Sequence, residues 1–420
     1  MSLILAIALA TAFPAQSPPR DARERKELIR EFFSLDDRGE AGHARRIEIV
    51  RVLDALPLER PSDRKKAVKE LLVAANDRRR MAKENGAYFW WETDRRGHYL
   101  VGGETRKPTA LLVGMHGGGV GSGDAESAAA GLDAAARDLG WLAIFPEVLE
   151  KTELGWTDSG TEEWVMDLIE CALRTWELAP DRVFLSGHSM GGYGTWALGA
   201  HHADRVAGLA ASAGAPSPIF GPDGKVVELM RGVIPNLRNV PLVVYQSLDD
   251  PNVPPDANQA AVRAIAAARK TWGGYDNFEY WEVDGRGHDY PPGGMAALLA
   301  KISARKREAT PAKLVWQPAL AWKRRFYWLS WQEPKLGAIL VAEADRASNV
   351  IRLSSRADLA GLEILLDERL VNLTKEVVVE VNGKVSWRGV PASLWGTLLL
   401  SAAEGDPDLI FPARVPAITR

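Results

Sequence analysis

The chain has 420 residues, of which 46% are hydrophobic and 25% charged, the proportions of an ordinary soluble globular protein. This composition excludes wholesale disorder and a polytopic membrane protein, and at about 150 residues per domain the length predicts two to three domains. The 52 Lys and Arg residues are balanced by 55 Asp and Glu residues, so the net charge of -3 offers no general attraction to nucleic acid. The single cysteine, Cys171, excludes an intramolecular disulfide and a cysteine-based zinc cluster.

An apolar stretch at 3–13 is followed by a proline-rich break. Its roughly 11 residues are too few to span a bilayer, which needs ~20. Ala10-Thr11-Ala12 supplies a small-x-small cleavage site, although no Lys or Arg precedes the apolar stretch. We expect residues 1–20 to be a signal peptide and linker and the protein to be exported to the periplasm or the medium. A cytoplasmic protein with an N-terminal extension is the alternative.

The segment 21–85 is dense in charge and predicts three helices. Ser62 follows Pro61 as the expected N-cap of the third helix. Arg78-Arg79-Arg80 is expected on a solvated helix face rather than at a nucleic-acid site, because acidic residues are mixed through the same helices. The expected spans are 21–34, 40–56 and 62–84.

From Tyr88 onward, short apolar runs alternate with amphipathic helices. This pattern predicts the α/β class, with a doubly wound, mostly parallel sheet flanked by helices over 86–307. Ser159-x-x-Glu162 is the expected capping box of the second helix. The expected strands are 110–115, 142–145, 182–186, 208–211, 242–246 and 278–282, and the expected helices are 125–139, 161–178, 191–201 and 256–271.

Beyond about Arg307 the helical periodicity stops, and short strand-like runs predict a C-terminal β-sandwich-like domain over 308–420. This region holds six of the fifteen tryptophans and no His or Cys. Asn382-Gly383 predicts a two-residue hairpin turn. Two tryptophan pairs, Trp328 with Trp331 and Trp387 with Trp395, are expected in the sandwich core, with an exposed aromatic platform as the alternative. The expected strands are 326–331, 338–342, 350–353, 362–366, 377–381 and 384–387.

The motif with the most chemical content is Gly187-His188-Ser189-Met190-Gly191, which directly follows a predicted strand and opens a predicted helix. A G-x-S-x-G motif in this context predicts a nucleophile elbow, with Ser189 as the nucleophile. The motif alone is common by chance, so the assignment depends on a base and an acid elsewhere in the chain.

In this arrangement the acid and then the histidine follow the serine along the chain. Of the seven histidines, His201 and His202 come too soon after Ser189 to fold back onto it and are expected at the surface. His288 remains, in a Gly-rich loop after a predicted strand, and is the expected general base.

The acid is expected in the loop after strand 242–246, where Asp249 and Asp250 are adjacent. We prefer Asp250, because it begins the sequence Asp-x-x-Val-Pro, the register in which a loop after a buried strand usually presents the acid. Asp249 is then expected to be a turn residue. The acid would fix the tautomer of His288 and stabilise the imidazolium.

His116-Gly117-Gly118-Gly119 follows another predicted strand and matches an HGGG-type oxyanion motif. The amide of Gly117 or Gly118, together with that of Met190, is the expected oxyanion hole. No P-loop and no G-x-G-x-x-G motif is present, and no metal-ligand spacing occurs, so we expect no cofactor and no metal. Trp156, in the stretch 150–158, is expected either to line the substrate pocket or to make ordinary loop contacts.

These segments in combination resemble the α/β-hydrolase serine esterases related to polyhydroxybutyrate depolymerases, feruloyl esterases and prolyl-oligopeptidase-like hydrolases. The resemblance covers roughly 110–300 and implies the α/β-hydrolase fold with a Ser-Asp-His triad. Ser247 replaces the usual glycine three residues before the acid. The matching segments are LLVGMHGGG at 111–119, DRVFLSGHSMGGYGTWALG at 181–199, the Asp250 loop and the His288 loop.

The function expected from these residues is hydrolysis of a carboxylic ester through an acyl-enzyme. The substrate would be polymeric if the C-terminal region docks on it, and neither a nucleic-acid partner nor a stable membrane span is expected. Two alternatives stay open: a serine peptidase of the prolyl-oligopeptidase-like type, and a polymer- or carbohydrate-binding protein with an idle hydrolase fold.

Overall fold

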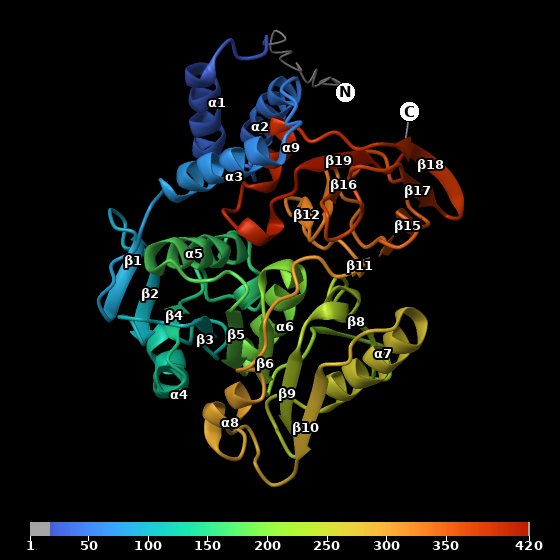
Figure 1. Ribbon diagram of the computed structural model, residues 1–420. Coiled ribbons are helices and arrows are strands. Elements are labelled where there is room, and N and C mark those ends of the chain that lie inside the picture. Colours follow the sequence, from blue (N-terminus) through green and yellow to red (C-terminus); the bar gives the residue numbers. More distant parts are fainter. Residues whose placement is uncertain (1–16, 419–420) are drawn as a thin grey trace, which may run out of the picture.

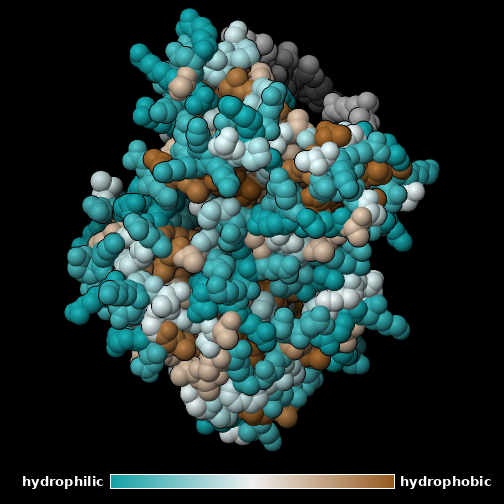
Figure 2. Space-filling view, viewed as in Figure 1, coloured by the Kyte–Doolittle hydropathy of each residue, from teal (hydrophilic) through white to brown (hydrophobic). Residues whose placement is uncertain are grey.

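The computed structural model describes residues 17–418. The apolar stretch of the expected signal peptide lies outside the described residues. No helix of the described part of the chain is both long and apolar enough to cross a membrane. The visible face is largely hydrophilic, with apolar residues in separate small patches (Figure 2).

An eight-stranded sheet forms the centre of residues 86–307, which we call the hydrolase region (Figure 1). Its strand order is β1-β2-β4-β3-β5-β6-β9-β10. Strand β2 is antiparallel to both of its neighbours, and the remaining neighbours run parallel. This is the mostly parallel α/β-hydrolase sheet that the sequence predicts. The strands are β1 (Gly86–Trp91), β2 (Arg96–Gly103), β3 (Leu111–Met115), β4 (Leu142–Pro146), β5 (Val183–His188), β6 (Gly208–Ser212), β9 (Leu242–Ser247) and β10 (Phe278–Val283).

Helices cover both faces of this sheet. Helices α4 and α8 pack on one face, and α5, α6 and α7 pack on the other (Figure 1). All residues of β3 and β4 are buried, as expected for strands covered on both sides. The helices are α4 (Ala125–Asp138), α5 (Thr161–Trp176), α6 (Met190–His201), α7 (Asp256–Trp272) and α8 (Gly294–Ala300). A small hairpin, β7 (Pro218–Phe220) with β8 (Val226–Leu229), lies in the connection between β6 and β9.

The N-terminal helices α1 (Ala22–Ser34), α2 (Glu40–Asp54) and α3 (Pro61–Asn76) form a separate core with α9 (Trp395–Ser401) near the other end of the chain. The N-terminal helices and the C-terminal region therefore pack against each other, as Figure 1 shows. Helix α9 was not expected, because its seven residues are too short to display a periodic pattern.

The third N-terminal helix differs from its prediction at both ends. It begins at Pro61, with Arg60 rather than Ser62 at the N-cap position, because proline is favoured in the first helical turn. It ends at Asn76, so the prediction that Arg78-Arg79-Arg80 lies on a helix face is wrong. Instead, Arg78 pairs with Glu170 of α5 at 3.4 Å and the guanidinium of Arg79 lies 3.9 Å from the ring centre of Trp90.

The C-terminal region contains two sheets, as the predicted sandwich-like domain requires. One has the strand order β11-β14-β15-β17-β18 and the other β12-β13-β16-β19. The strands are β11 (Lys313–Trp316), β12 (Arg325–Phe326), β13 (Leu329–Trp331), β14 (Leu340–Asp345), β15 (Val350–Ser355), β16 (Leu362–Leu366), β17 (Val377–Val381), β18 (Lys384–Gly389) and β19 (Ala413–Pro416). The expected hairpin turn is present, with φ of 50° at Asn382 and 77° at Gly383.

Three of the four tryptophans considered for an exposed platform are buried. Trp328 and Trp331 are fully buried, and Trp395 is buried against the N-terminal helices. Trp387 is half-buried and packs against the main core. The core position is therefore confirmed for Trp328 and Trp331, and the alternative of an exposed aromatic platform is wrong for them.

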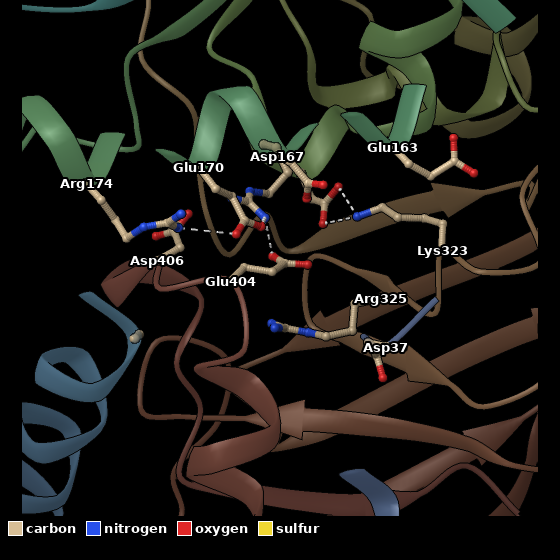
Figure 3. Close-up of polar contacts among 12 residues, drawn as sticks. Asp37, Glu163, Asp167, Glu170, Arg174, Lys323, Arg325, Glu404 and Asp406 are labelled. Atoms are coloured by element: carbon tan, nitrogen blue, oxygen red, sulfur yellow. Dashed lines mark hydrogen bonds and ion pairs between the residues drawn. The ribbon is translucent and has the colours of Figure 1, made fainter. Parts of the chain in front are cut away.

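The C-terminal region is attached to the hydrolase region through buried polar contacts. Tyr327 donates a hydrogen bond to the Ala203 carbonyl at 2.7 Å, and Lys323 pairs with Asp204 at 2.8 Å. Figure 3 shows Lys323, Glu404 and Asp406 next to the helix that carries Glu170 and Arg174, and Arg325 farther from it. One apolar core runs through both regions, so they bury a common interface.

Candidate active site

Ser189 lies on the sharp turn between β5 and α6. Its φ of 58° and ψ of -124° are strained for a residue with a side chain, as in a nucleophile elbow. A Cβ atom at Gly191 would come within 2.1 Å of the Met115 carbonyl oxygen. This position therefore excludes any larger residue, which is the physical reason for the glycine in the motif.

The structure brings Ser189, His288 and Asp250 together from three different loops. The Nε2 atom of His288 lies 2.9 Å from Ser189 Oγ, and its Nδ1 atom lies 2.8 Å from Asp250 Oδ2. The carboxylate of Asp250 is buried and also accepts hydrogen bonds from the amides of Asn252 and Val253, each at 2.9 Å. A carboxylate at Nδ1 favours the tautomer whose Nε2 can accept the serine proton.

Asp249 is more than the turn residue that the sequence predicted. Its Oδ1 atom accepts hydrogen bonds from the amides of Arg286 and Gly287, at 3.1 and 2.9 Å, and from Ser247 Oγ at 2.5 Å. These hydrogen bonds, led by the one from Ser247, lower the pKa of Asp249. Asp249 thus joins the acid loop to the loop that carries His288, and the serine that replaces the usual glycine at 247 takes part in that junction.

The glycine-rich loop after β3 lies directly beside the serine. A Cβ atom at Gly117 would be 3.2 Å from the Cβ of Ser189, while Gly118 has a φ of 137° and lies against Ser122 and Gly123. Among residues 17–418, the amides of Gly117, Gly118 and Met190 have no hydrogen-bond acceptor. Gly117 lies nearer to Ser189 than Gly118 does, at the place where the sequence predicts an oxyanion hole.

The buried side chain of His116 fixes the glycine-rich loop through hydrogen bonds. It is buried, its Nδ1 atom bonds to the Gly117 carbonyl at 2.8 Å, and its Nε2 atom accepts from the Val148 amide at 3.2 Å. Burial lowers the pKa of His116, so the ring is neutral at pH 7. Trp156 donates from Nε1 to the His116 carbonyl at 3.2 Å, which fixes the loop from a second side.

A cleft of about 880 Å³ opens at Ser189. Its walls come from the glycine-rich loop, the start of α4, the segment 152–157, the start of α6 and the loops of Asp250 and His288. The segment 152–157 includes the 3-10 turn η1 (Gly155–Thr157). The expectation that this stretch lines the pocket is therefore confirmed, and Trp156 does so while buried.

The predicted surface position of His201 and His202 is wrong. Both are buried, and both lie against Glu162 of α5, with nitrogen–oxygen distances of 2.9 and 3.0 Å. Burial alone would raise the pKa of Glu162, but the two histidines outweigh it and lower the pKa to about 2. The predicted capping box of Ser159 and Glu162 is wrong, because the N-cap of α5 is Gly160, which has no side chain. Only the return hydrogen bond is present, from the Gly160 amide to the Glu163 carboxylate at 3.0 Å.

His98, Glu126 and Glu147 are the one group of potential metal ligands within the described ranges. Lys151 already pairs with Glu147 at 2.9 Å. These residues come from distant parts of the chain, so no sequence spacing could have revealed them.

No protein-family model matches the chain, and no curated protein matches it significantly. Solved structures that are similar include a thermostable esterase, with 18% identity over 53% of this chain and 63% of its own length and a TM-score of 0.41. A ferulic acid esterase from Anaeromyces mucronatus has 17% identity over 53% of this chain and 89% of its own, with a TM-score of 0.36. An acetyl xylan esterase from Aspergillus awamori has 12% identity over 50% and 94%, with a TM-score of 0.38. Each of these similarities covers about half of this chain.

Proposed function

We propose that the protein is a serine hydrolase that cleaves carboxylic esters through an acyl-enzyme. The observation that carries this proposal is the continuous hydrogen-bonded path from Ser189 Oγ through His288 to the buried carboxylate of Asp250. A serine hydroxyl becomes a competent nucleophile when an adjacent base removes its proton as it attacks.

In the first half of the reaction, Ser189 Oγ attacks the ester carbonyl carbon while its proton moves to His288 Nε2. The oxygen that becomes negatively charged receives hydrogen bonds from the amides of Gly117 and Met190. One such donor is worth about 3 kcal/mol in the transition state. His288 then gives the proton to the departing alcohol, which leaves the acyl group on Ser189.

In the second half, a water molecule attacks the acyl-enzyme and its proton moves to His288. Collapse of the second tetrahedral intermediate releases the acid, and Ser189 recovers its proton from His288. Asp250 keeps its charge throughout and stabilises the imidazolium. The net reaction is ester plus water to acid plus alcohol.

The test is turnover of p-nitrophenyl acetate and p-nitrophenyl butyrate, with alanine p-nitroanilide in parallel. Ser189→Ala should lower ester turnover by at least about a thousandfold, because the nucleophile and base act as a unit. Ser217→Ala, which alters another serine of the same cleft, is the matched control and should retain most of the activity. Full ester turnover in Ser189→Ala would refute the proposal, and anilide cleavage at a rate comparable with ester cleavage would replace it with a peptidase.

A further inference from the structure

Apart from its histidines, the cleft is lined by charged side chains of one sign. Of the described residues that line it, none is Lys or Arg. The carboxylates of Asp124 and Glu153 are the ionisable acids that line the same cleft. Two of the lining histidines, His116 and His188, are neutral at pH 7, because burial is the largest of the effects that lower their pKa values.

Asp124 is held in place by the helix that it caps. It is the N-cap of α4, and its Oδ1 atom accepts a hydrogen bond from the Ser127 amide at 2.8 Å. This hydrogen bond is the main cause that lowers the pKa of Asp124, so the group is ionised at neutral pH. The carboxylate therefore presents a fixed negative charge to the cleft.

Glu153 contributes the second charge from the segment that follows β4. Its side chain is exposed, and it makes no ion pair within the part of the chain that the structure describes. The Gly121 amide donates a hydrogen bond to the Lys151 carbonyl at 2.9 Å, which joins this segment to the glycine-rich loop. Asp124 and Glu153 thus belong to connected segments on the oxyanion side of Ser189.

No Lys or Arg lines the cleft beside these two carboxylates. The neighbouring Lys151 does not line the cleft; its ammonium group pairs with Glu147 at 2.9 Å and is one of the smaller influences that lower the pKa of Asp124. Apart from these two carboxylates and three histidines, the lining is uncharged and includes Tyr193, Asn252 and Val253. A cleft with charges of one sign and low-dielectric walls concentrates ligands of the opposite charge and repels those of the same charge.

We infer that the cleft selects esters that carry a positively charged group, such as an ammonium, and discriminates against anionic esters. This inference rests on the proposed ester hydrolysis and assigns specificity to Asp124 and Glu153. The same field acts on the products. A carboxylic acid released in the cleft is an anion at neutral pH, so the two carboxylates also favour its departure.

The experiment compares three acetate esters of similar size: acetylcholine, its uncharged isostere 3,3-dimethylbutyl acetate, and 2-sulfoethyl acetate. Titration of the released acetic acid at constant pH gives kcat/KM without a chromogenic group. At low ionic strength we expect kcat/KM to be about three- to tenfold higher for acetylcholine than for the isostere, and lower by a similar factor for the sulfonate. In about 0.5 M NaCl these ratios should approach one, because the Debye length then falls to a few ångströms.

Two variants assign the effect to residues. Asp124→Asn removes the charge while asparagine still caps the helix, and Glu153→Gln removes the second charge. Each should reduce the preference for acetylcholine about two- to threefold. Asp138→Asn is the matched control, because this exposed aspartate ends the same helix about 20 Å from Asp124, beyond the reach of a screened charge.

The outcomes separate the two proposals. If the uncharged isostere is hydrolysed and the wild-type protein treats all three esters alike at low salt, the inference fails while the proposed ester hydrolysis stands. A preference that is unchanged in the Asp124→Asn/Glu153→Gln double variant would also overturn it. If none of the three esters is hydrolysed and p-nitrophenyl esters are not hydrolysed either, the proposed function itself fails.

Discussion

The ring of His188 lies 4.8 Å from the ring of His288, so two imidazoles pack against each other beside Ser189. The Nδ1 atom of His188 bonds to Ser212 Oγ at 2.9 Å. Burial first, and then the neighbouring His288, lower the pKa of His188 to about 4, although Asp250 acts in the opposite direction. A neutral His188 can contact His288 without opposing the positive charge that His288 would acquire during catalysis.

The lowered pKa of His188 predicts that the stability of the protein depends on pH. An unfolded histidine titrates near pH 6.5, so between about pH 6.5 and 4 the unfolded chain binds a proton that folded His188 does not. The free energy of unfolding should therefore fall as the pH drops through this window, by about 1–3 kcal/mol from this residue. In His188→Gln that part of the loss should disappear. Urea unfolding at pH 7 and pH 4.5 measures it, and an identical pH dependence in the two proteins would contradict the assignment.

A second prediction concerns Asp249, which holds the loop of His288 through the amides of Arg286 and Gly287. Asp249→Ala removes these acceptors, and we expect kcat/KM for p-nitrophenyl acetate to fall about 10- to 100-fold, because small displacements of a base are costly. Asp249→Asn keeps an acceptor oxygen, so its kcat/KM should fall much less. Asp250→Asn should lower kcat about 10⁴-fold, since asparagine favours the wrong tautomer of His288. Equal losses in the alanine and asparagine variants at 249 would rule out this role.

A third prediction tests the attachment of the C-terminal region. Lys323 and Asp204 form a buried ion pair, so Lys323→Met leaves a buried carboxylate without its partner. The free energy of unfolding should fall by about 3–5 kcal/mol, and the double variant Lys323→Met/Asp204→Leu should recover most of it. Lys306→Met is the control, because the Lys306 side chain is largely exposed and its pair with Asp181 should be worth about 1 kcal/mol or less. A double variant as unstable as the single one would show that the charge pair is not the cause.

The sequence predicts well what is encoded locally. Helices α4 to α7 begin and end close to their predicted residues. Helices α4, α5 and α7 have an apolar stripe, whereas α6 is buried on nearly all sides and its start was predicted from the G-x-S-x-G motif. Strands β1 and β2 were missed. Strand β1, at the edge of the sheet, is half exposed and lacks a regular alternation. The sequence also gave no indication that α9 would complete the core of the N-terminal helices, since that contact joins opposite ends of the chain.

For the candidate site, strand-end motifs were sufficient to select Ser189, Asp250 and His288, which the fold brings within hydrogen-bonding distance. The supporting residues could not be selected in this way. The burial of His201 depends on Glu162, 39 residues earlier, and the role of Asp249 depends on amides 37 and 38 residues later. Such contacts are made by tertiary packing and leave no periodic signal.

The most direct test of the central claim is covalent labelling with a p-nitrophenyl phosphonate, followed by mass spectrometry of the intact protein and of its peptides. We expect one phosphonyl group per chain, located on the peptide that contains Ser189, and no labelling in Ser189→Ala. In His288→Ala the labelling rate should fall by at least about a thousandfold, because the serine loses its base. Labelling at another residue, or rapid labelling of Ser189 without His288, would contradict the account.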